Sequence, residues 1–341
     1  MTWTMPHEGV RQDRLWVAWP TKGYTLGDTA EDAATARRTW AAVANAAAQF
    51  QRVTVVACPQ DVDVARHHLS AAVEIRARGI DDAWIRDAGP TFVTDGPRLG
   101  AVTWVFNGWG AQEWATWDLD ATLGPAVAQW AGAERVDSDL VNEGGGIHVD
   151  GEGTVLVTET VQLDPGRNPG LSRADVETEL ARTLGATHAI WLPRGLTRDS
   201  ATYGTRGHVD IVATFAEPGV VLLHDQRDDG HPDHAVTAAV RAVLADAVDA
   251  RGKPLELVDL PAPRTLRDAD GWVDHSYVNH VLVNGAVIAC AFDDPHDVEA
   301  VAVLRDAYPG REVVTVDARP LFERGGGIHC ITQQQPAVPP V

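Results

Sequence analysis

One pentapeptide, Gly-Gly-Gly-Ile-His, occurs twice in this chain, at Gly144–His148 and at Gly325–His329. An acidic residue, Glu143 or Glu323, shortly precedes each copy, and a β-type run follows it. Distant repeats of this kind are typical of folds that arrange several copies of one supersecondary unit. Together with roughly a dozen expected strands, the repeat predicts a mixed α+β fold of about five strand-and-helix modules closed into a ring.

Short β-rich runs alternate with amphipathic stretches along the sequence, and no long linker separates them. We therefore treat residues 1–341 as a single domain. Helical spacing predicts helices over Asp32–Phe50, Asp61–Ala71, Ala121–Ala131, Ser172–Leu184 (with Ser172 as N-cap), Ala235–Ala250 and Pro295–Ala307 (with Pro295 in the first turn). Strands are expected over Arg52–Cys58, Thr91–Val93, Leu99–Phe106, Thr154–Thr158, His188–Leu192, His208–Phe215, Val220–His224, Leu255–Val258, Tyr277–Val283, Val287–Cys290, Glu312–Val316 and Ile328–Thr332, and Asn284-Gly285 predicts a tight hairpin.

The composition excludes several classes of protein. A hydrophobic fraction of 45% excludes wholesale disorder, and a net charge of −20 argues against nucleic acid or an anionic membrane surface as a partner. No 18 apolar residues run together, and the charges of Glu8, Arg11, Asp13 and Arg14 interrupt the region where a signal peptide would need an apolar stretch. A cytoplasmic protein is expected. The acidity would attract small cations, although compositional bias explains it more simply.

The chain has three cysteines, too few and too scattered for a disulfide framework. Cys58 and Cys290 end apolar runs and are expected to be buried fillers. Cys330 differs because it follows the triple glycine Gly325–Gly327, which lets the backbone approach a ligand closely. The equivalent position in the other copy of the pentapeptide is the inert Val149. This asymmetry makes Cys330 the candidate nucleophile.

A thiol needs a proton-transfer partner, since its unperturbed pKa of about 8.5 leaves it mostly protonated at neutral pH. His208 and Asp210 alternate in an expected strand, so their side chains would point to one face. His148 and Asp150 have the same spacing, and spacing alone does not choose between the two pairs. Such pairs also leave a zinc site open as an alternative, although no His-x-His cluster supports one.

The segment Trp84–Pro90 places a tryptophan beside the charges of Arg86 and Asp87, just before a strand. An ion pair on a surface turn would explain it most simply. Together with the candidate thiol, however, an acid beside an aromatic ring suits a planar cation, which a carboxylate can hold in its plane and a ring can cover.

These motifs resemble those of the agmatine deiminases, guanidino-modifying pentein enzymes related to the bacterial peptidylarginine deiminases. The resemblance covers most of the chain and is carried by Trp84–Pro90, Glu143–Thr158, Arg167–Pro169, Trp191–Gly195, Gly207–Asp210, Ser276–Asn279, Asp293–Pro295 and Gly325–Pro336. It implies a five-bladed, pseudo-symmetric β/α propeller. It also implies a hydrolase of linear amidines that converts agmatine and water to N-carbamoylputrescine and ammonia in polyamine biosynthesis, without a metal or other cofactor. A homodimer is compatible with it.

The resemblance implies that Cys330 is the nucleophile, that His208 is the general acid and base, and that Glu143 is the polar partner of His208. Asp87 and Asp210 would hold the guanidinium while Sγ forms a covalent thiouronium adduct, which water then hydrolyses. Residues expected to line the same substrate site are Trp84, Trp109, Arg206 and Gly327.

The chain departs from the family pattern just before Gly207. Where agmatine deiminases usually carry an acid that helps to hold the distal amine, this chain has Gly204, and Arg206 adds a cation nearby. Ile211 also replaces an asparagine. These departures leave open a guanidino substrate with a neutral or carboxylate tail. An amidinotransferase on the same fold, a protein that only binds guanidino ligands, and a metal hydrolase are competing interpretations of the same motifs.

Overall fold

The structure is a computed structural model that describes residues 2–339, so the predicted domain 1–341 extends by three residues beyond the described range. Four of its sheets share one pattern. Two antiparallel strands are followed by a helix and then by a third strand that runs parallel to the second. These sheets, each with its helix, are β4 (Thr91–Asp95), β5 (Arg98–Val105), α5 (Leu123–Ala131) and β6 (Glu134–Val141); β7 (Ile147–Val149), β8 (Thr154–Thr158), α7 (Arg173–Leu184) and β9 (His188–Leu192); β10 (Ala213–Glu217), β11 (Val220–Asp225), α8 (Pro232–Asp246) and β12 (Glu256–Pro261); and β15 (Val281–Val283), β16 (Ala286–Ala291), α9 (Asp297–Ala307) and β17 (Glu312–Asp317).

A further sheet joins the two ends of the chain. Its order is β18 (Thr332–Pro336), β1 (Gln12–Ala18), β2 (Arg52–Ala57) and β3 (Glu74–Ala77). β18 is antiparallel to β1, whereas β1, β2 and β3 are parallel and are connected through α1 (Ala30–Ala47) and α2 (Val62–His68). Because β18, the antiparallel partner of β1, comes from the C-terminal end, this sheet joins the first and last strands of the chain.

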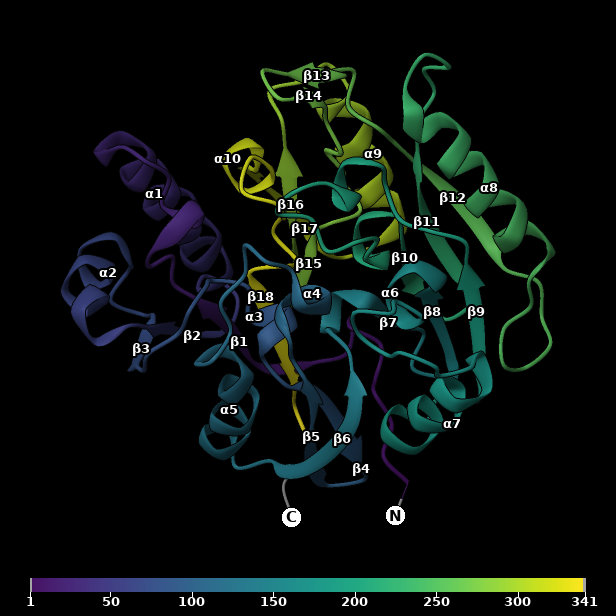
Figure 1. The fold of residues 1–341 in the computed structure, drawn as a ribbon, viewed down its shortest axis with the longest axis horizontal. Helices are drawn as coiled ribbons and strands as arrows, with labels where there is room; N and C mark the ends of the chain where they lie inside the picture. The colour runs from purple at the N-terminus through teal and green to yellow at the C-terminus, as the bar shows by residue number, and fades with distance from the viewer. Residues whose placement is uncertain (1, 340–341) are drawn as a thin grey trace.

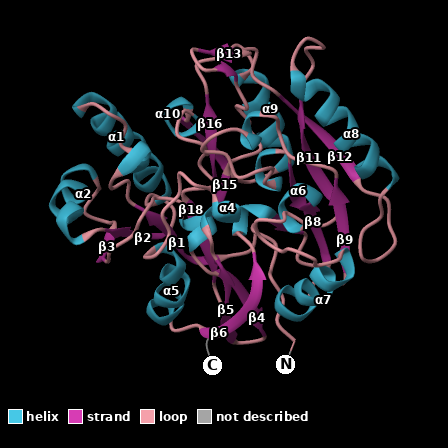
Figure 2. Ribbon diagram, viewed as in Figure 1, coloured by secondary structure: helices cyan, strands magenta, loops and turns pink. Residues whose placement is uncertain are grey.

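The five sheets are spaced around a common centre, with α1, α2, α5, α7 and α8 on the outside (Figure 1). Loops and short helices fill the central region, and the strands radiate from it (Figure 2). The remaining α-helices and strands are short: α3 (Ile85–Ala88), α4 (Gly108–Ala111), α6 (Glu159–Gln162), α10 (Arg319–Phe322), and the two-stranded ribbon of β13 (Arg267–Asp268) and β14 (Gly271–Trp272). Several 3-10 turns of three residues lie between the elements.

Local chemistry explains the element boundaries that the sequence predicts well. Ser172 caps α7 with a capping box, in which its hydroxyl accepts the N–H of Asp175 and the Asp175 carboxylate accepts the N–H of Ser172. Asn284-Gly285 forms a two-residue hairpin between β15 and β16, and the positive φ of Gly285 (81°) is the conformation that glycine adopts without strain.

The core consists of two clusters of buried apolar side chains. The larger one extends through the sheets of β1, β11 and β16, and the smaller one lies between the sheets of β5 and β8. Both Cys58 and Cys290 are buried in the larger cluster, as expected of fillers. Within residues 2–339, no helix has both the length and the apolar character that crossing a membrane would require.

Four predictions of local structure are wrong. Residues 209–211 form a 3-10 turn and the strand begins only at Ala213, so His208 and Asp210 do not alternate along a strand. Tyr277–His280 form a turn before β15, and β18 begins at Thr332, two residues after Cys330. Pro295 precedes the N-cap of α9, which is His296. In the first three segments side chains bind the backbone in place of ladder partners; the N–H of His208, for example, donates to Asp199.

Candidate active site

Cys330 lies in the turn before β18, with 4% of its surface exposed. Its Sγ lies 3.6 Å from Oδ2 of Asp210 and 3.3 Å from Nδ2 of Asn279, which donates to it. The Asn279 amide is fixed in this orientation because its Oδ1 accepts the backbone N–H of His329 at 2.9 Å. The thiol is therefore held between an amide and a carboxylate from two other sheet units.

Asp210 is anchored on one oxygen and free on the other. Its Oδ2 accepts a hydrogen bond from Nδ1 of His329 at 2.8 Å, while its buried Oδ1 has no partner among the described residues. On the far side of His329, Nε2 lies 3.0 Å from Oε1 of Glu8, which also pairs with Arg86 at 3.3 Å. This buried chain of charges leaves one Asp210 oxygen available to a ligand next to the sulfur.

Asp87, in α3, faces the same place from another direction. Its Oδ2 accepts the indole N–H of Trp109 at 2.9 Å, and its Oδ1 accepts the N–H of Gly145 at 3.2 Å. Trp109 has a φ of 56°, a strained conformation for a bulky residue. A Cβ at Gly145 would lie 2.4 Å from Nδ1 of His208, so only glycine allows this approach.

His208 is buried between two carboxylates. Its Nε2 lies 3.3 Å from Oε2 of Glu143, and its Nδ1 lies 3.8 Å from Oδ1 of Asp87. Arg167 donates through Nε to both oxygens of Glu143 at 3.0 Å. Glu143 therefore fixes the imidazole through Nε2, and Nδ1, which has no hydrogen-bond partner among the described residues, faces the site.

Burial and neighbouring charges set the protonation states. Burial raises the pKa of Asp87 to about 6, helped by Glu143 and Asp210 and opposed by His208. Burial by itself would lower the pKa of His208, but Asp87 and Glu143 outweigh it and raise that pKa to about 9. The pKa of Cys330 lies well above its usual value because burial and the charges of Asp210 and Asp87 all disfavour the thiolate.

Two other carboxylates respond in the opposite direction. Although burial favours their neutral forms, Arg167 and His208 hold the pKa of Glu143 below its usual value, and His329 does the same for Asp210. At neutral pH the site thus combines a neutral thiol, a protonated imidazole and ionised carboxylates. A bound cation would offset the carboxylates that suppress the thiolate.

The structure brings five predicted residues, Cys330, His208, Glu143, Asp87 and Asp210, into this one cluster. Trp109 joins it through Asp87. Trp84 lies behind the second glycine run, since a Cβ at Gly326 would be 2.6 Å from its ring, and Gly327 lies against the Asn279 amide. A small cavity beside Cys330 is lined by Asp199, Thr205, His208, Asp210, Ile211, Asp274, Phe322, Gly325 and Gly326.

Arg206 does not line that cavity. Its guanidinium pairs with Asp164 at 3.0 Å, and Asp164 in turn binds Arg167 at 2.8 Å. We therefore no longer expect Arg206 to contact the substrate. The backbone of Arg206 has a φ of 70°, a conformation uncommon for residues other than glycine.

Sequence reasoning missed several residues that shape the site. Asn279 and Arg167 lie in segments that carry the family resemblance, and their polarity beside such motifs was a usable signal. Asp199 had no signal, although it accepts the backbone N–H groups of Thr205, Gly207 and His208. Glu8 and Asp274 could not be predicted as site residues either, because the neighbouring sequence does not indicate which groups their side chains contact.

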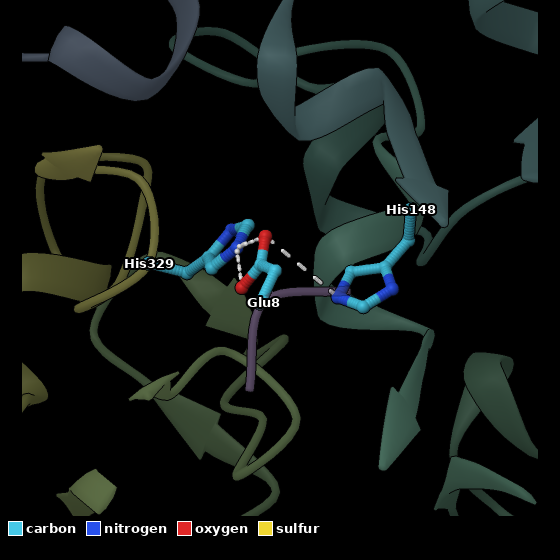
Figure 3. Close-up of side chains that lie close together, drawn as sticks. All are labelled: Glu8, His148 and His329. Atoms are coloured by element: carbon cyan, nitrogen blue, oxygen red, sulfur yellow. Dashed lines mark hydrogen bonds and ion pairs between the residues drawn. The ribbon is translucent and has the colours of Figure 1, made fainter. Parts of the chain in front are cut away.

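Glu8, His148 and His329 form the one group in the described range whose ligand atoms lie close enough together for a metal (Figure 3). The chemistry does not fit a cation. His148 accepts the N–H of Phe215 on Nδ1, so its Nε2 carries the proton, which points to Thr214 at 2.6 Å. Arg86 already supplies a positive charge to Glu8. The zinc alternative therefore has no support in this cluster.

Comparisons with known proteins place the site in context. The sequence model of the Porphyromonas-type peptidyl-arginine deiminase family matches residues 4–336. A Streptomyces coelicolor protein provisionally named an agmatine deiminase is 54% identical over 338 residues, which cover 98% of this chain and 99% of that protein. Agmatine deiminase of Stutzerimonas stutzeri is 40% identical over 357 residues, covering 98% and 95%.

Among solved structures, agmatine deiminase of Enterococcus faecalis is similar over 98% of this chain and 96% of its own, with a TM-score of 0.92 and 30% identity. The similarity thus extends over nearly the whole chain at the level of both sequence and fold.

Proposed function

This chain belongs to the Porphyromonas-type peptidyl-arginine deiminase family, and on that premise we propose that it hydrolyses agmatine to N-carbamoylputrescine and ammonia. The observation that carries the proposal is the convergence of Asp87 and Asp210, from separate sheet units, on one buried thiol beside a protonated imidazole. Paired carboxylates suit a flat, doubly hydrogen-bonding guanidinium.

Two unpartnered atoms mark where the substrate would lie. Oδ1 of Asp210 and Nδ1 of His208 are both buried and without hydrogen-bond partners among the described residues. A guanidinium between Asp87 and Asp210 would donate to the free Asp210 oxygen and present its central carbon to Sγ of Cys330. Its positive charge would also stabilise the thiolate, so that the thiol proton leaves when substrate binds.

The thiolate then adds to the guanidinium carbon, and His208 donates its Nδ1 proton to the nitrogen that departs as ammonia. A thiouronium adduct on Cys330 remains. Neutral His208 takes a proton from water, and the resulting hydroxide attacks the adduct. The C–S bond then breaks, the hydroxyl proton of the tetrahedral adduct returns to the sulfur to restore the thiol, and the ureido product is released. Overall, one guanidinium group and one water give a neutral ureido group and one ammonium ion, because the proton that the thiol releases to solvent on substrate binding combines with the ammonia. Glu143 acts by orienting His208 and stabilising its protonated form.

The competing substrates and reactions are less well supported. A carboxylate-tailed compound would meet the carboxylates of Asp199 and Asp274 on the cavity wall. An amidinotransferase would form its adduct by expelling the tail amine, whereas the proposed deiminase expels ammonia and retains the tail. The two reactions therefore leave adducts of different mass on Cys330.

The test is to incubate the protein with agmatine, measure ureido product and ammonia, and determine the adduct mass after rapid acid quenching. We expect product without any added amine acceptor, and an adduct equal to agmatine less ammonia. Cys330→Ala should abolish both, while the matched control Cys58→Ala, another buried cysteine, should retain them. An adduct that lacks the tail, or activity in Cys330→Ala, would refute the proposal.

We extend the proposal to the fold: the five sheet units would constitute the blades of one pseudo-symmetric β/α propeller in a single catalytic domain. The repeated antiparallel-then-parallel strand order supports this interpretation. The cytoplasmic location, the role in polyamine biosynthesis, the homodimer and the absence of a cofactor stay predictions.

A further inference from the structure

Two adjoining cavities lead away from Cys330. The inner cavity has a volume of only about 10 Å³, whereas the outer cavity has a volume of about 550 Å³. Both are lined by Asp199, Asp274, Phe322 and Gly325, which therefore form the neck between them. A substrate whose guanidinium lies at the sulfur would extend its tail through this neck, with some yielding of the walls.

Gly204 leaves one wall of the outer cavity without a side chain. A Cβ at this position would lie 2.1 Å from the carbonyl oxygen of Asp199, so the local backbone excludes any other residue. A counter-charge for a cationic tail must therefore come from elsewhere on the wall. Two carboxylates of the outer cavity, Asp270 and Glu323, already lie 3.9 Å from Arg198 and 3.7 Å from Arg324.

The two carboxylates of the neck differ in what they already bind. Asp199 accepts hydrogen bonds on both oxygens from the backbone N–H groups of Thr205, Gly207 and His208 and from the Thr205 hydroxyl, so it serves to hold the loop. Asp274 accepts only the N–H of its own backbone among the described residues. The cation that acts on it, Arg198, lines the outer cavity but is bonded to Asp268 at 2.6 Å. Asp274 is thus a carboxylate that forms no ion pair with another described residue.

The electrostatic environment of Asp274 points the same way. Asp274 is half-buried. Partial loss of hydration raises its pKa to about 7, and the charges of Asp199 and Asp233 add to this effect while Arg198 opposes it. A ligand ammonium at the neck would favour the ionised form of Asp274, because its positive charge would offset both the loss of hydration and the repulsion from Asp199 and Asp233.

The cavity on the other side of the site offers no such group. It is lined by Tyr24, Trp114 and Tyr203 with Asp81 and Asp82. Asp81 pairs with Lys22 at 3.2 Å and accepts the N–H of Leu119 at 2.7 Å. Asp82 accepts the Thr25 hydroxyl and the N–H of Ala83. Both carboxylates are therefore already partnered.

We propose that Asp274 is the specificity-determining residue that binds the terminal ammonium of the substrate at the neck between the two cavities. The inference rests on the proposed deiminase function and names the group that distinguishes a cationic tail from a neutral or acidic one. It assigns this selection to the loop that connects β14 to β15 rather than to the loop around Gly204.

The test compares three substrates of similar chain length: agmatine, 1-butylguanidine and 4-guanidinobutyrate. In Asp274→Asn we expect kcat/KM for agmatine to fall about 10- to 100-fold, mainly through KM, while 1-butylguanidine changes by less than about twofold. Turnover of 4-guanidinobutyrate should rise, since the repulsion of its carboxylate is removed. Asp306→Asn, which removes the same charge from α9, a helix that lines neither cavity, is the matched control.

A pH series adds a readout that a structural role would not move. In the unmutated protein the preference for agmatine over 1-butylguanidine should fall as the pH drops from about 8 to about 6, because Asp274 then takes up a proton. In Asp274→Asn this preference should not depend on pH.

The outcomes separate the two claims. No ureido product from either agmatine or 1-butylguanidine in the unmutated protein would refute the deiminase function. Normal turnover of agmatine with an unchanged substrate ratio in Asp274→Asn would overturn the role of Asp274 and leave the function standing. An equal loss of both substrates would also overturn it, since the residue would then act only on the fold.

Discussion

The two copies of the Gly-Gly-Gly-Ile-His pentapeptide place their histidines on either side of one glutamate, but only one of the two histidines is charged. The rings of His148 and His329 lie 6.2 Å apart, and Glu8 lies between them (Figure 3). Burial lowers the pKa of His148 to about 3, so it is neutral. For His329, burial and Arg86 would also lower the pKa, but Glu8 and Asp210 outweigh them and raise the pKa of His329 above its usual value.

The difference comes from the partner on Nδ1. In His148 this nitrogen accepts the backbone N–H of Phe215, which requires a lone pair and so a neutral ring. In His329 it donates to the carboxylate of Asp210, which favours a proton on both nitrogens. Identical local sequence therefore leaves the charge of a histidine undecided, and a partner from a distant segment decides it.

The backbone after each copy also differs. Ile147–Val149 continue as β7, where Val149 pairs with Val155 of β8. After the second copy the chain turns, and Cys330 is displayed to the cavity before β18 begins. A side chain fixed in a ladder packs into the core, whereas one in a turn can face a ligand.

The largest effect is expected from exchanging the residues that follow the two copies. Cys330→Val should reduce turnover of agmatine by about 10⁴-fold or more, since the proposed nucleophile is lost. The reciprocal Val149→Cys should keep normal turnover, because its thiol would be buried in the smaller core cluster away from Asp87 and Asp210. Restoration of activity in a protein carrying both changes would contradict the distinction between turn and strand.

The next effect concerns the charge of His329. His329→Gln should lower kcat/KM by about 10- to 100-fold. It should also shift the acid limb of the pH profile to higher pH, because the pKa of Asp210 rises when its cationic partner is lost. The same shift, in smaller measure, is expected of Glu8→Gln.

His148→Gln is the control for this prediction. It removes the ring from the equivalent position of the other copy without touching Asp210, so the acid limb should stay in place. A profile that moves equally in both variants would mean that the two histidines act only on the fold.

The two histidines should affect stability at opposite ends of the pH scale. His148 resists a proton that the unfolded chain accepts below about pH 6.5, so its presence destabilises the fold as the pH falls toward 3. His329 holds its proton in the folded state, so its contribution is full below about pH 6.5 and is lost as the pH rises through its raised pKa.

Thermal or urea unfolding between about pH 5 and pH 9 measures this contrast, with a limit of about 1.4 kcal/mol per pH unit for each proton. His148→Gln should flatten the acid side of the stability curve and His329→Gln the alkaline side. Other buried neutral histidines, such as His224 and His280, lower the curve in acid for all variants, so the difference between variants is the quantity to compare.

The smallest effect is expected at Thr214, whose hydroxyl contacts Nε2 of His148 at 2.6 Å. Thr214→Val leaves the protonated Nε2 without that acceptor and should cost about 1 to 3 kcal/mol of the free energy of unfolding. Activity should change by less than about twofold, since His148 takes no part in the proposed chemistry. A loss of activity comparable with that of His329→Gln would show that the first copy also positions the site.

Much of the framework could be predicted without the structure. The alternation of strands and helices, the Ser172 cap and the Asn284-Gly285 hairpin follow from local rules, and the asymmetry of the two pentapeptides singled out Cys330. The errors of local structure at Val209–Ile211, at Tyr277–His280 and before Thr332 fall in segments that carry site residues. There, side chains bind backbone groups that a strand would otherwise pair, and no periodic pattern reports such bonds.

The sequence by itself determined the order of the elements and the candidate reactive groups, because periodicity, capping and side-chain chemistry are local properties. Only the tertiary structure decided which histidine is charged, that Arg206 pairs with Asp164 rather than lining the cavity, and that Asp274 stands unpaired at the neck. The physical reason is that a proton or an ion pair depends on groups within a few ångströms in space. In this chain such groups, like Glu8 and His329, come from opposite ends of the sequence.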